Sequence, residues 1–288
     1  MTQRLWADLA LVAVTIVWGT TFVVVKDAVA DVGPLTLIAL RFSIGLAALA
    51  LLYPRSVGAA LSRWPAGLAL GLSLGSGFAL QTAGLQVTTA AKAGFITGLN
   101  VVLVPFLALW LLRQRPGPNA VAGVALATVG LGLVSLRGDL TVEIGDLLVL
   151  GCAFAFALHI VLTSQFTHSR PVATLLAQQL AVVAGLTSVG ALALERPGVP
   201  PLPIILAAAY LGAIATALVF AIQTWAQRFT TPTHTGLIYA LEPVFAAFFA
   251  WLWHGELLTG RALFGCILIL AGVCLAELPI ALWRKSSD

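Results

Sequence analysis

The chain has 288 residues, of which 60% are hydrophobic and only 9% are charged. A soluble protein of this size needs a polar surface that so few charged residues cannot supply, and a disordered chain needs more charge and less hydrophobicity. The formal net charge is +4, but the basic residues stand singly in short loops, which is typical of membrane topology rather than of nucleic-acid binding. The composition therefore predicts an integral membrane protein whose surroundings are a lipid bilayer, with no nucleic-acid partner.

Ten apolar segments follow one another along the chain, each long enough for a helix to cross a bilayer. Because every segment is apolar on nearly all sides, we expect helices with internally satisfied backbones, not the alternating pattern of a β-barrel. The loops between them are too short for a soluble catalytic domain. The sequence predicts an all-α polytopic membrane protein with ten transmembrane helices, over residues 8–27, 35–53, 65–84, 93–112, 118–136, 145–164, 172–193, 202–222, 234–253 and 262–283.

The distribution of Lys and Arg predicts which side of the membrane holds the termini. Ten crossings place both termini on one side, and cytoplasmic loops carry the excess of basic residues. With the termini in the cytoplasm, the outer loops hold Lys26, Lys92, Arg137, Arg196 and Arg261. The inner side then holds the larger set, Arg4, Arg55, Arg63, Arg113, Arg115, Arg170, Arg228, Arg284 and Lys285. Both termini are therefore expected in the cytoplasm.

The second half of the chain repeats the first at an ungapped offset of 142 residues. The segment 78–82, Phe-Ala-Leu-Gln-Thr, aligns with 220–224, Phe-Ala-Ile-Gln-Thr, and 17 of the 56 positions from 78 to 133 are identical. We expect two five-helix repeats, residues 1–142 and 143–288, inserted with opposite orientation because five is odd. Many secondary transporters are built in this way, with a binding site between the repeats near the bilayer midplane and alternating access. A duplicated structural scaffold, or a channel without alternating access, is the alternative.

Polar residues recur at equivalent positions of the two repeats. Thr97 and Asn100 align with Tyr239 and Glu242, and residues three apart share one face of a helix. This recurrence predicts a hydrophilic cavity between the repeats. The equivalent pair Gln81 and Gln223 fits such a cavity and interhelical hydrogen bonding equally well.

Glu242 points more strongly to function, because a carboxylate inside the membrane is costly to retain. Pro243 removes a hydrogen-bond donor and frees the carbonyl of Tyr239, as Pro105 does for Val101. These prolines do not align at the offset of 142, so we expect the two repeats to bend differently. Arg41, inside the second apolar segment, is expected to extend toward the interface or to pair with a helix end.

An apolar cavity with a few polar anchors suits an amphipathic small molecule. Neither a metal-ligating cluster, a phosphate-binding loop nor a Ser/His/Asp arrangement is seen in the sequence, so we expect no metal, no cofactor and no catalytic residue. Glu242 and His159 are candidates for proton coupling, although a lone histidine is more often a packing residue. The candidate substrate-binding residues are Trp18, Thr21, Phe22, Phe78, Gln81, Thr97, Asn100, Gln223, Tyr239 and Glu242.

Two stretches carry a family resemblance, Trp-Gly-Thr-Thr-Phe at 18–22 and Leu-Glu-Pro-Val-Phe at 241–245. With them, the whole chain resembles the EamA-type members of the drug/metabolite transporter superfamily, and among these the YddG-type amino-acid exporters. The first half departs from the pattern, with Arg-Gln-Arg at 113–115 where the second half has Gly-Glu at 255–256.

The resemblance implies a secondary transporter that exports aromatic and other amino acids across a bacterial inner membrane, with roles for Trp18, Thr21, Phe22 and Glu242. Export of cationic drugs or nucleoside-like metabolites is an alternative, because an embedded carboxylate would serve there too. An intramembrane enzyme acting on lipid-linked substrates is a more remote one.

Overall fold

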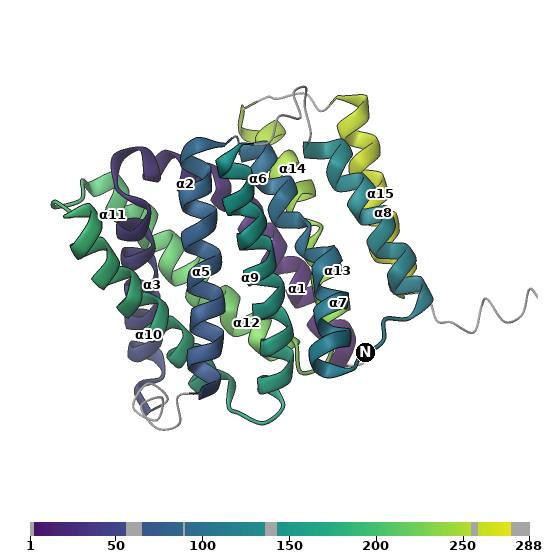
Figure 1. Cartoon of the computed structure of the whole chain (residues 1–288), viewed down its shortest axis with the longest axis horizontal. Helices are drawn as coiled ribbons and strands as arrows, with labels where there is room; N and C mark the ends of the chain where they lie inside the picture. The colour runs from purple at the N-terminus through teal and green to yellow at the C-terminus, as the bar shows by residue number, and fades with distance from the viewer. Residues whose placement is uncertain (1–2, 56–64, 89, 136–142, 255–258, 278–288) are drawn as a thin grey trace, which may run out of the picture.

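The chain folds into a bundle of helices whose axes run nearly parallel to one another (Figure 1). The computed structural model describes residues 3–55, 65–88, 90–135, 143–254 and 259–277. Within these ranges all regular structure is helical. In the first half of the chain the helices are α1 (Gln3–Gly19), α2 (Thr21–Asp31), α3 (Pro34–Leu52), α5 (Pro65–Val87), α6 (Ala90–Gly98), α7 (Asn100–Leu112) and α8 (Pro118–Ser135). In the second half they are α9 (Ile144–Thr167), α10 (Val172–Gly190), η1 (Ala191–Glu195), α11 (Leu202–Ala209), η2 (Tyr210–Leu218), α12 (Val219–Ala226), α13 (Pro232–Tyr239), α14 (Glu242–His254) and α15 (Gly260–Glu277).

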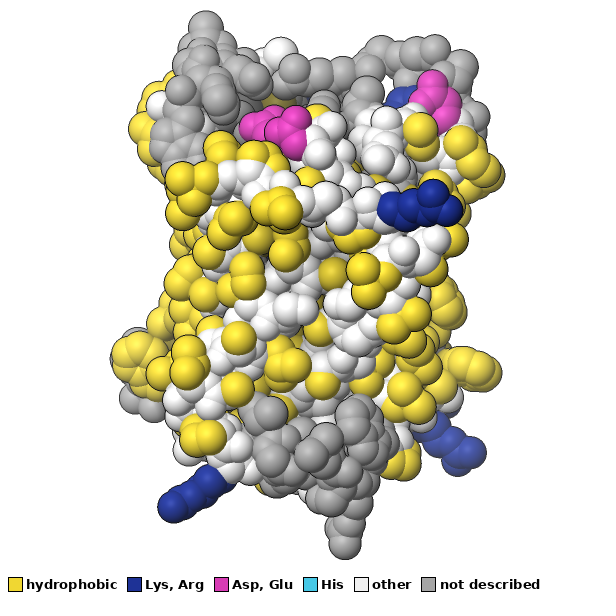
Figure 2. All heavy atoms as spheres, turned by 90° about the vertical axis from the view of Figure 1, so that its left-hand side faces the viewer, with side chains coloured by type: hydrophobic (Ala, Val, Ile, Leu, Met, Phe, Trp, Pro, Cys, Tyr) yellow, Lys and Arg dark blue, Asp and Glu magenta, His cyan; other side chains and the backbone are white. Residues whose placement is uncertain are grey.

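The described helices account for the ten predicted membrane crossings. Six helical stretches are long and apolar enough to span a bilayer, one of which, Lys92–Leu112, includes parts of both α6 and α7, and α8 and α15 are shorter apolar helices. The other two crossings are each split into two helices, α1 with α2 and α13 with α14. Figure 2 shows apolar side chains over the middle of one face of the bundle, with charged side chains toward its upper and lower ends. The protein is therefore a multi-pass membrane protein, as its composition predicts.

The contact between α8 and α15 shows that the two halves are inverted relative to each other. A Cβ atom added to Gly123 would lie 2.5 Å from the carbonyl oxygen of Gly272, and one added to Gly130 would lie 2.5 Å from that of Gly265. The helices are thus antiparallel and pack backbone against backbone, which only glycine permits. At the offset of 142, Gly123 is equivalent to Gly265 and Gly130 to Gly272. Exchanging the halves therefore reproduces the same contact, as an inverted repeat requires.

Three of the crossings are interrupted by a tightened turn near their middle. The interruptions lie at Thr20, between α1 and α2, at Leu99, between α6 and α7, and at Ala240 and Leu241, between α13 and α14. At each, a backbone N–H donates to the carbonyl three residues earlier, for example from Leu99 to Ile96 at 3.1 Å and from Leu241 to Ile238 at 3.0 Å. Thr20, Leu99 and Ala240 all have ψ between −10° and −18°.

The two repeats differ in their interruptions, since the first crossing is broken at Thr20 while its equivalent, α9, is continuous, but neither proline accounts for the break shared by the fourth and ninth crossings. Leu99 and Leu241 are equivalent at the offset of 142, so the fourth and ninth crossings are interrupted at the same place. Pro105 lies inside α7, away from the interruption. Pro243 lies in the first turn of α14, where a missing N–H costs no helical hydrogen bond. The interruption therefore belongs to the repeated fold and not to either proline.

Candidate functional site

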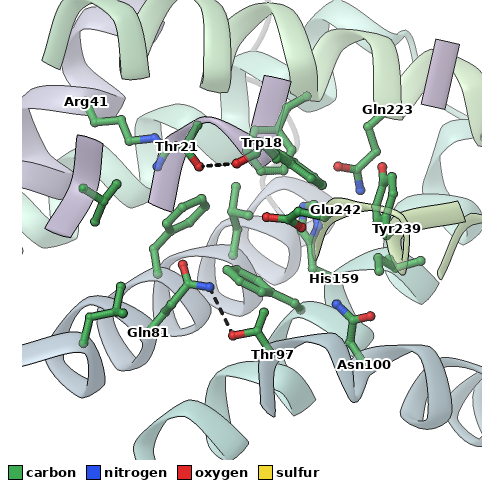
Figure 3. Close-up of a pocket in the computed structure, with 17 residues that line it drawn as sticks. Trp18, Thr21, Arg41, Gln81, Thr97, Asn100, His159, Gln223, Tyr239 and Glu242 are labelled. Atoms are coloured by element: carbon green, nitrogen blue, oxygen red, sulfur yellow. Dashed lines mark hydrogen bonds between the residues drawn. The ribbon is translucent and has the colours of Figure 1, made fainter. Parts of the chain in front are cut away.

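A cavity lies in the middle of the bundle, where the three interrupted crossings meet. Helices of both repeats form its wall (Figure 3). Each interruption places two residues, three apart in sequence, on the cavity side: Trp18 with Thr21, Thr97 with Asn100, and Tyr239 with Glu242. The cavity is therefore built on discontinuous helices at the interface of the repeats, the usual place for a transporter binding site.

The structure brings together almost all of the residues that the sequence suggested. Every candidate substrate-binding residue except Phe22 lines this one cavity, as does His159. The side chain of Phe22 lies outside the part of the structure that is described. Gln81 donates a hydrogen bond to the hydroxyl of Thr97 at 3.2 Å, across two helices of the first repeat (Figure 3).

Arg41 of α3 also lines the cavity, and its expected position was wrong. Only 4% of its surface is exposed, so it does not extend toward the interface. Its Nε donates to Thr216 Oγ1 at 2.5 Å, and its guanidinium carbon lies 4.5 Å from the centre of the Phe78 ring. The signal that could have included it among the site residues is the one applied to Glu242: a charged side chain inside the membrane marks a functional position by default.

The wide helical turn of η2 explains how Arg41 is held inward. One carbonyl oxygen in η2, that of Ala215, accepts from Arg41 Nη2 at 3.1 Å and from Trp18 Nε1 at 3.2 Å. Such π-helical segments shift the backbone hydrogen-bond register and are common at functional sites. The second repeat thereby positions two cavity residues that belong to the first repeat.

Aromatic rings form the apolar part of the cavity wall. The Trp18 ring lies 5.6 Å from that of Phe220 and 5.0 Å from that of Tyr239, and Phe78 lies 5.2 Å from Phe156. Separations of this size and their tilted or edge-on angles are favourable for aromatic pairs. Sequence reasoning did not select Phe156 or Phe220 as site residues, since a single aromatic residue in a transmembrane helix is usually a packing residue.

His159 is buried beside this aromatic wall. Its Nε2 lies 2.7 Å from the side-chain oxygen of Gln179, and its ring stands edge-on to that of Phe220. Gln179 itself is fully buried in α10. The contact fixes the histidine ring while leaving it at the edge of the cavity.

Several polar atoms of the cavity have no hydrogen-bond partner among the described residues. These are the hydroxyl of Tyr239 and the side-chain oxygen of Gln223, although both residues are at least nine-tenths buried. The carboxylate of Glu242 likewise forms no hydrogen bond within the described ranges, and interacts electrostatically with Arg41. Buried polar groups are normally satisfied, so these atoms are available to a ligand or to water.

The described residues that line the cavity reach closer to one end of the bundle than to the other. Val25 and Leu85 line it, and Leu85 lies two residues before the end of α5, at the face opposite the N-terminus. The equivalent residues at the N-terminal face are Thr167 and Gln227, and both are fully buried. Gln227 donates to the carbonyl of Ile160 at 2.9 Å and accepts from Gln223 at 3.2 Å. These bonds close the cavity at the N-terminal face.

A second hollow, of about 580 Å³, lies beyond this closure at the N-terminal face. Arg228 lines it and donates to Thr167 Oγ1 at 3.1 Å and to the carbonyl of Arg170 at 2.6 Å. Arg228 follows Gln227 directly, so about one helical turn separates the hollow from the central cavity. We call Thr167, Gln227 and Arg228 the N-terminal plug.

A model of the EamA-like transporter family matches residues 5–136 and again residues 143–278. The chain belongs to this family. An uncharacterized transporter of Archaeoglobus fulgidus is 33% identical over 281 residues, which cover 96% of this chain and 88% of that protein. The resemblance to the drug/metabolite transporter superfamily is thus confirmed, and the protein is a membrane transporter.

Two bacterial relatives are each named a probable amino-acid metabolite efflux pump. The one from Escherichia coli K12 is 29% identical, over 95% of this chain and 95% of its own length. The one from Salmonella typhimurium is 30% identical, over 90% of this chain and 91% of its own length. A crystal structure with 23% sequence identity superposes with a TM-score of 0.82, covering 98% of this chain and 99% of that one, and so has the same fold.

Proposed function

We propose that this EamA-family transporter exports amino acids and related small metabolites across a bacterial inner membrane. The observation that carries the proposal is the cavity at the interface of the repeats, where aromatic rings surround buried polar atoms that have no partner. The relatives named amino-acid metabolite efflux pumps support the choice of substrate.

Transport proceeds by alternating access between the two repeats, residues 1–142 and 143–288. With both termini in the cytoplasm, as the basic residues predict, the N-terminal plug closes the cytoplasmic side and the cavity faces outward. The inward-facing state then requires the hydrogen bonds of Gln227 and Arg228 to break. An inverted repeat supplies both states, because the same packing can be exchanged between the halves.

Glu242 is the proposed carrier of a coupling proton, with His159 as the second candidate. Both line the cavity, so substrate and proton can compete for the same space. With purified protein in liposomes, a proton gradient directed against the movement of substrate should accelerate transport, and Glu242→Gln should abolish that acceleration. Equal rates with and without the gradient would show that export is driven by the substrate gradient alone.

The function is tested by counterflow of radiolabelled L-phenylalanine into liposomes that contain the purified protein and unlabelled amino acid. We expect accumulation that protein-free liposomes do not show and that leucine and tryptophan inhibit. If a lipophilic cation or a nucleoside drives counterflow and amino acids do not, the transporter belongs to the rival substrate class. If no solute moves and a lipid-linked substrate is converted instead, the protein is an intramembrane enzyme.

A further inference from the structure

We infer that Arg41 and Glu242 are the two charged poles that recognise the zwitterionic head group of the substrate. Arg41 binds the α-carboxylate and Glu242 binds the α-ammonium group, while the aromatic wall receives the side chain. This inference rests on the proposed export of amino acids and names the residues that select for them.

The charge of the cavity matches a zwitterion. Among the described residues that line it, Arg41 is the one basic side chain of fixed charge and Glu242 the one acidic side chain. They come from different repeats, on α3 and α14, and both extend into the same space (Figure 3). A ligand with one charge of each sign can therefore be neutralised at both ends. A cation would meet Arg41 and an anion would meet Glu242, each at a cost in a medium of low dielectric constant.

The two charges are close enough to interact but are not paired with each other. Each contributes to the electrostatic environment of the other, yet no ion pair joins them among the described residues. Charged groups inside a membrane usually pair with one another or face a water-filled space. Neither charge is therefore neutralised by an ion pair with the other.

Arg41 is arranged as a receptor for a carboxylate. Its Nε and Nη2 donate hydrogen bonds to two neutral acceptors, the hydroxyl of Thr216 and the carbonyl of Ala215. Those bonds and the Phe78 ring beneath the guanidinium fix its plane before a ligand arrives, which lowers the entropy lost on binding. The planar guanidinium is the cation best suited to a carboxylate, because its N–H groups form a rigid fork.

The apolar side chain of the ligand has a defined place beside this head-group site. Phe78 packs under Arg41 and also contacts the ring of Phe156, and Trp18 shares the Ala215 carbonyl with Arg41. An L-amino acid with its carboxylate on Arg41 therefore has aromatic rings within reach of its side chain. Aromatic and large aliphatic amino acids should be preferred.

Three compounds that share one ring test this assignment: L-phenylalanine, 2-phenylethylamine, which lacks the carboxylate, and 3-phenylpropionate, which lacks the ammonium group. Their binding to the purified protein in detergent is measured by calorimetry. The wild-type protein should bind L-phenylalanine at least about tenfold more tightly than either analogue, since each charge-assisted contact contributes that much or more. Arg41→Gln should remove the preference over the amine, and Glu242→Gln the preference over the acid.

Because the two variants should lose different preferences, the experiment distinguishes a loss of ligand recognition from a loss of folding. A variant that merely misfolds loses binding of all three compounds together. Arg41→Lys should keep part of the preference for L-phenylalanine over the amine. Thr216→Val, which frees Nε of Arg41, should selectively weaken the binding of L-phenylalanine. If both Gln variants reduce binding of the three compounds equally, Arg41 and Glu242 are not the poles, even if L-phenylalanine counterflow succeeds. If the wild-type protein binds and transports no amino acid at all, the proposed function itself fails.

Discussion

The two ends of the central cavity are built from equivalent positions of the two repeats, but they differ in residue type and in hydrogen bonding. At the end opposite the N-terminus, Val25 and Leu85 line the cavity. At the N-terminal end, their equivalents Thr167 and Gln227 are fully buried and hydrogen-bonded. The comparison teaches that the repeat fixes the framework of the transporter, while substitutions at a few equivalent positions decide how each end closes. One end is held by hydrogen bonds between polar side chains, and the other has apolar side chains at the equivalent positions.

Unlike the two ends of the cavity, the contact between α8 and α15 is the same when the repeats are exchanged. Disturbing it should have the largest effect on stability. A methyl group added by Gly130→Ala would lie 2.5 Å from the Gly265 carbonyl, so the backbones must separate. We expect a loss of about 1–3 kcal/mol in stability, the usual result of overpacking. Gly272→Ala, at the equivalent position, should cost the same. Thermal unfolding in detergent measures both variants.

Gly185→Ala is the matched control for this prediction. Gly185 also lies inside an apolar helix, α10, but an added Cβ meets no atom within 4 Å. This variant should be as stable as the wild-type protein or slightly more so, because alanine favours a helix over glycine. If Gly130→Ala and Gly185→Ala melt at the same temperature, the close contact of α8 with α15 does not hold the halves together.

Substitutions in the N-terminal plug should have the second largest effect, which is a change in the population of the open state. Gln227→Leu gives this end the residue that the other end has at Leu85, and removes hydrogen bonds to Ile160 and Gln223. At about 1 kcal/mol for each hydrogen bond, the open state should become about tenfold or more populated. Hydrogen exchange should then accelerate at the ends of α9 and α12.

The reverse substitution, Leu85→Gln, tests whether the plug depends on its surroundings as well as on the glutamine. It places the same side chain at the opposite end, where the equivalent of Thr167 is Val25. We expect no change in exchange at α9 and α12. An equal acceleration in both variants would contradict the assignment of the plug to the N-terminal end.

Near each end of the bundle, an acidic residue contacts a basic one. Replacing these acidic residues should have the smallest effects on stability, and the two effects should differ from each other. Asp146 lies 3.6 Å from Lys92, accepts from Thr88 at 2.6 Å and caps its own helix by accepting from Glu143 N at 3.1 Å. At the N-terminal end, Asp8 lies 3.4 Å from His234, the residue equivalent to Lys92. The two contacts thus join equivalent helices, but Asp8 otherwise forms an ion pair to Arg4 at 3.7 Å, whereas Asp146 also accepts hydrogen bonds from a hydroxyl and a helix cap.

Replacing each aspartate by asparagine sharpens this difference. Asp146→Asn should lower the stability by about 1–2 kcal/mol, because it disturbs a helix cap and a charged hydrogen bond together. Asp8→Asn should lower it by less than about 1 kcal/mol, because Asp8 contacts Arg4 and His234 near the surface, where ion pairs contribute little. Chemical unfolding of the two variants in parallel gives the comparison, and a larger loss for Asp8→Asn would reverse it.

Much of this architecture could be predicted from the sequence, because apolar length and an ungapped repeat are direct physical signals. The repeat also selected Thr97, Asn100, Tyr239 and Glu242, which the fold places together in the cavity. The interruptions at Thr20 and Leu99 could not be predicted, because nothing in their residue types breaks a helix. The inward position of Arg41 depends on the π-helical turn of η2, a tertiary feature with no local pattern. The N-terminal plug depends on contacts between α9 and α12 that no local pattern in the sequence indicates.

The central claim is that the cavity between the repeats is the substrate path. We would test it with Asn100→Cys in a protein whose native cysteines, Cys152, Cys266 and Cys274, are replaced by alanine. A membrane-impermeant thiol reagent added at the face opposite the N-terminus should label this cysteine, and L-phenylalanine should protect it. Thr167→Cys, in the plug, should stay unlabelled under the same conditions. Labelling of Asn100→Cys that is indifferent to L-phenylalanine, in protein that still transports it, would contradict the account.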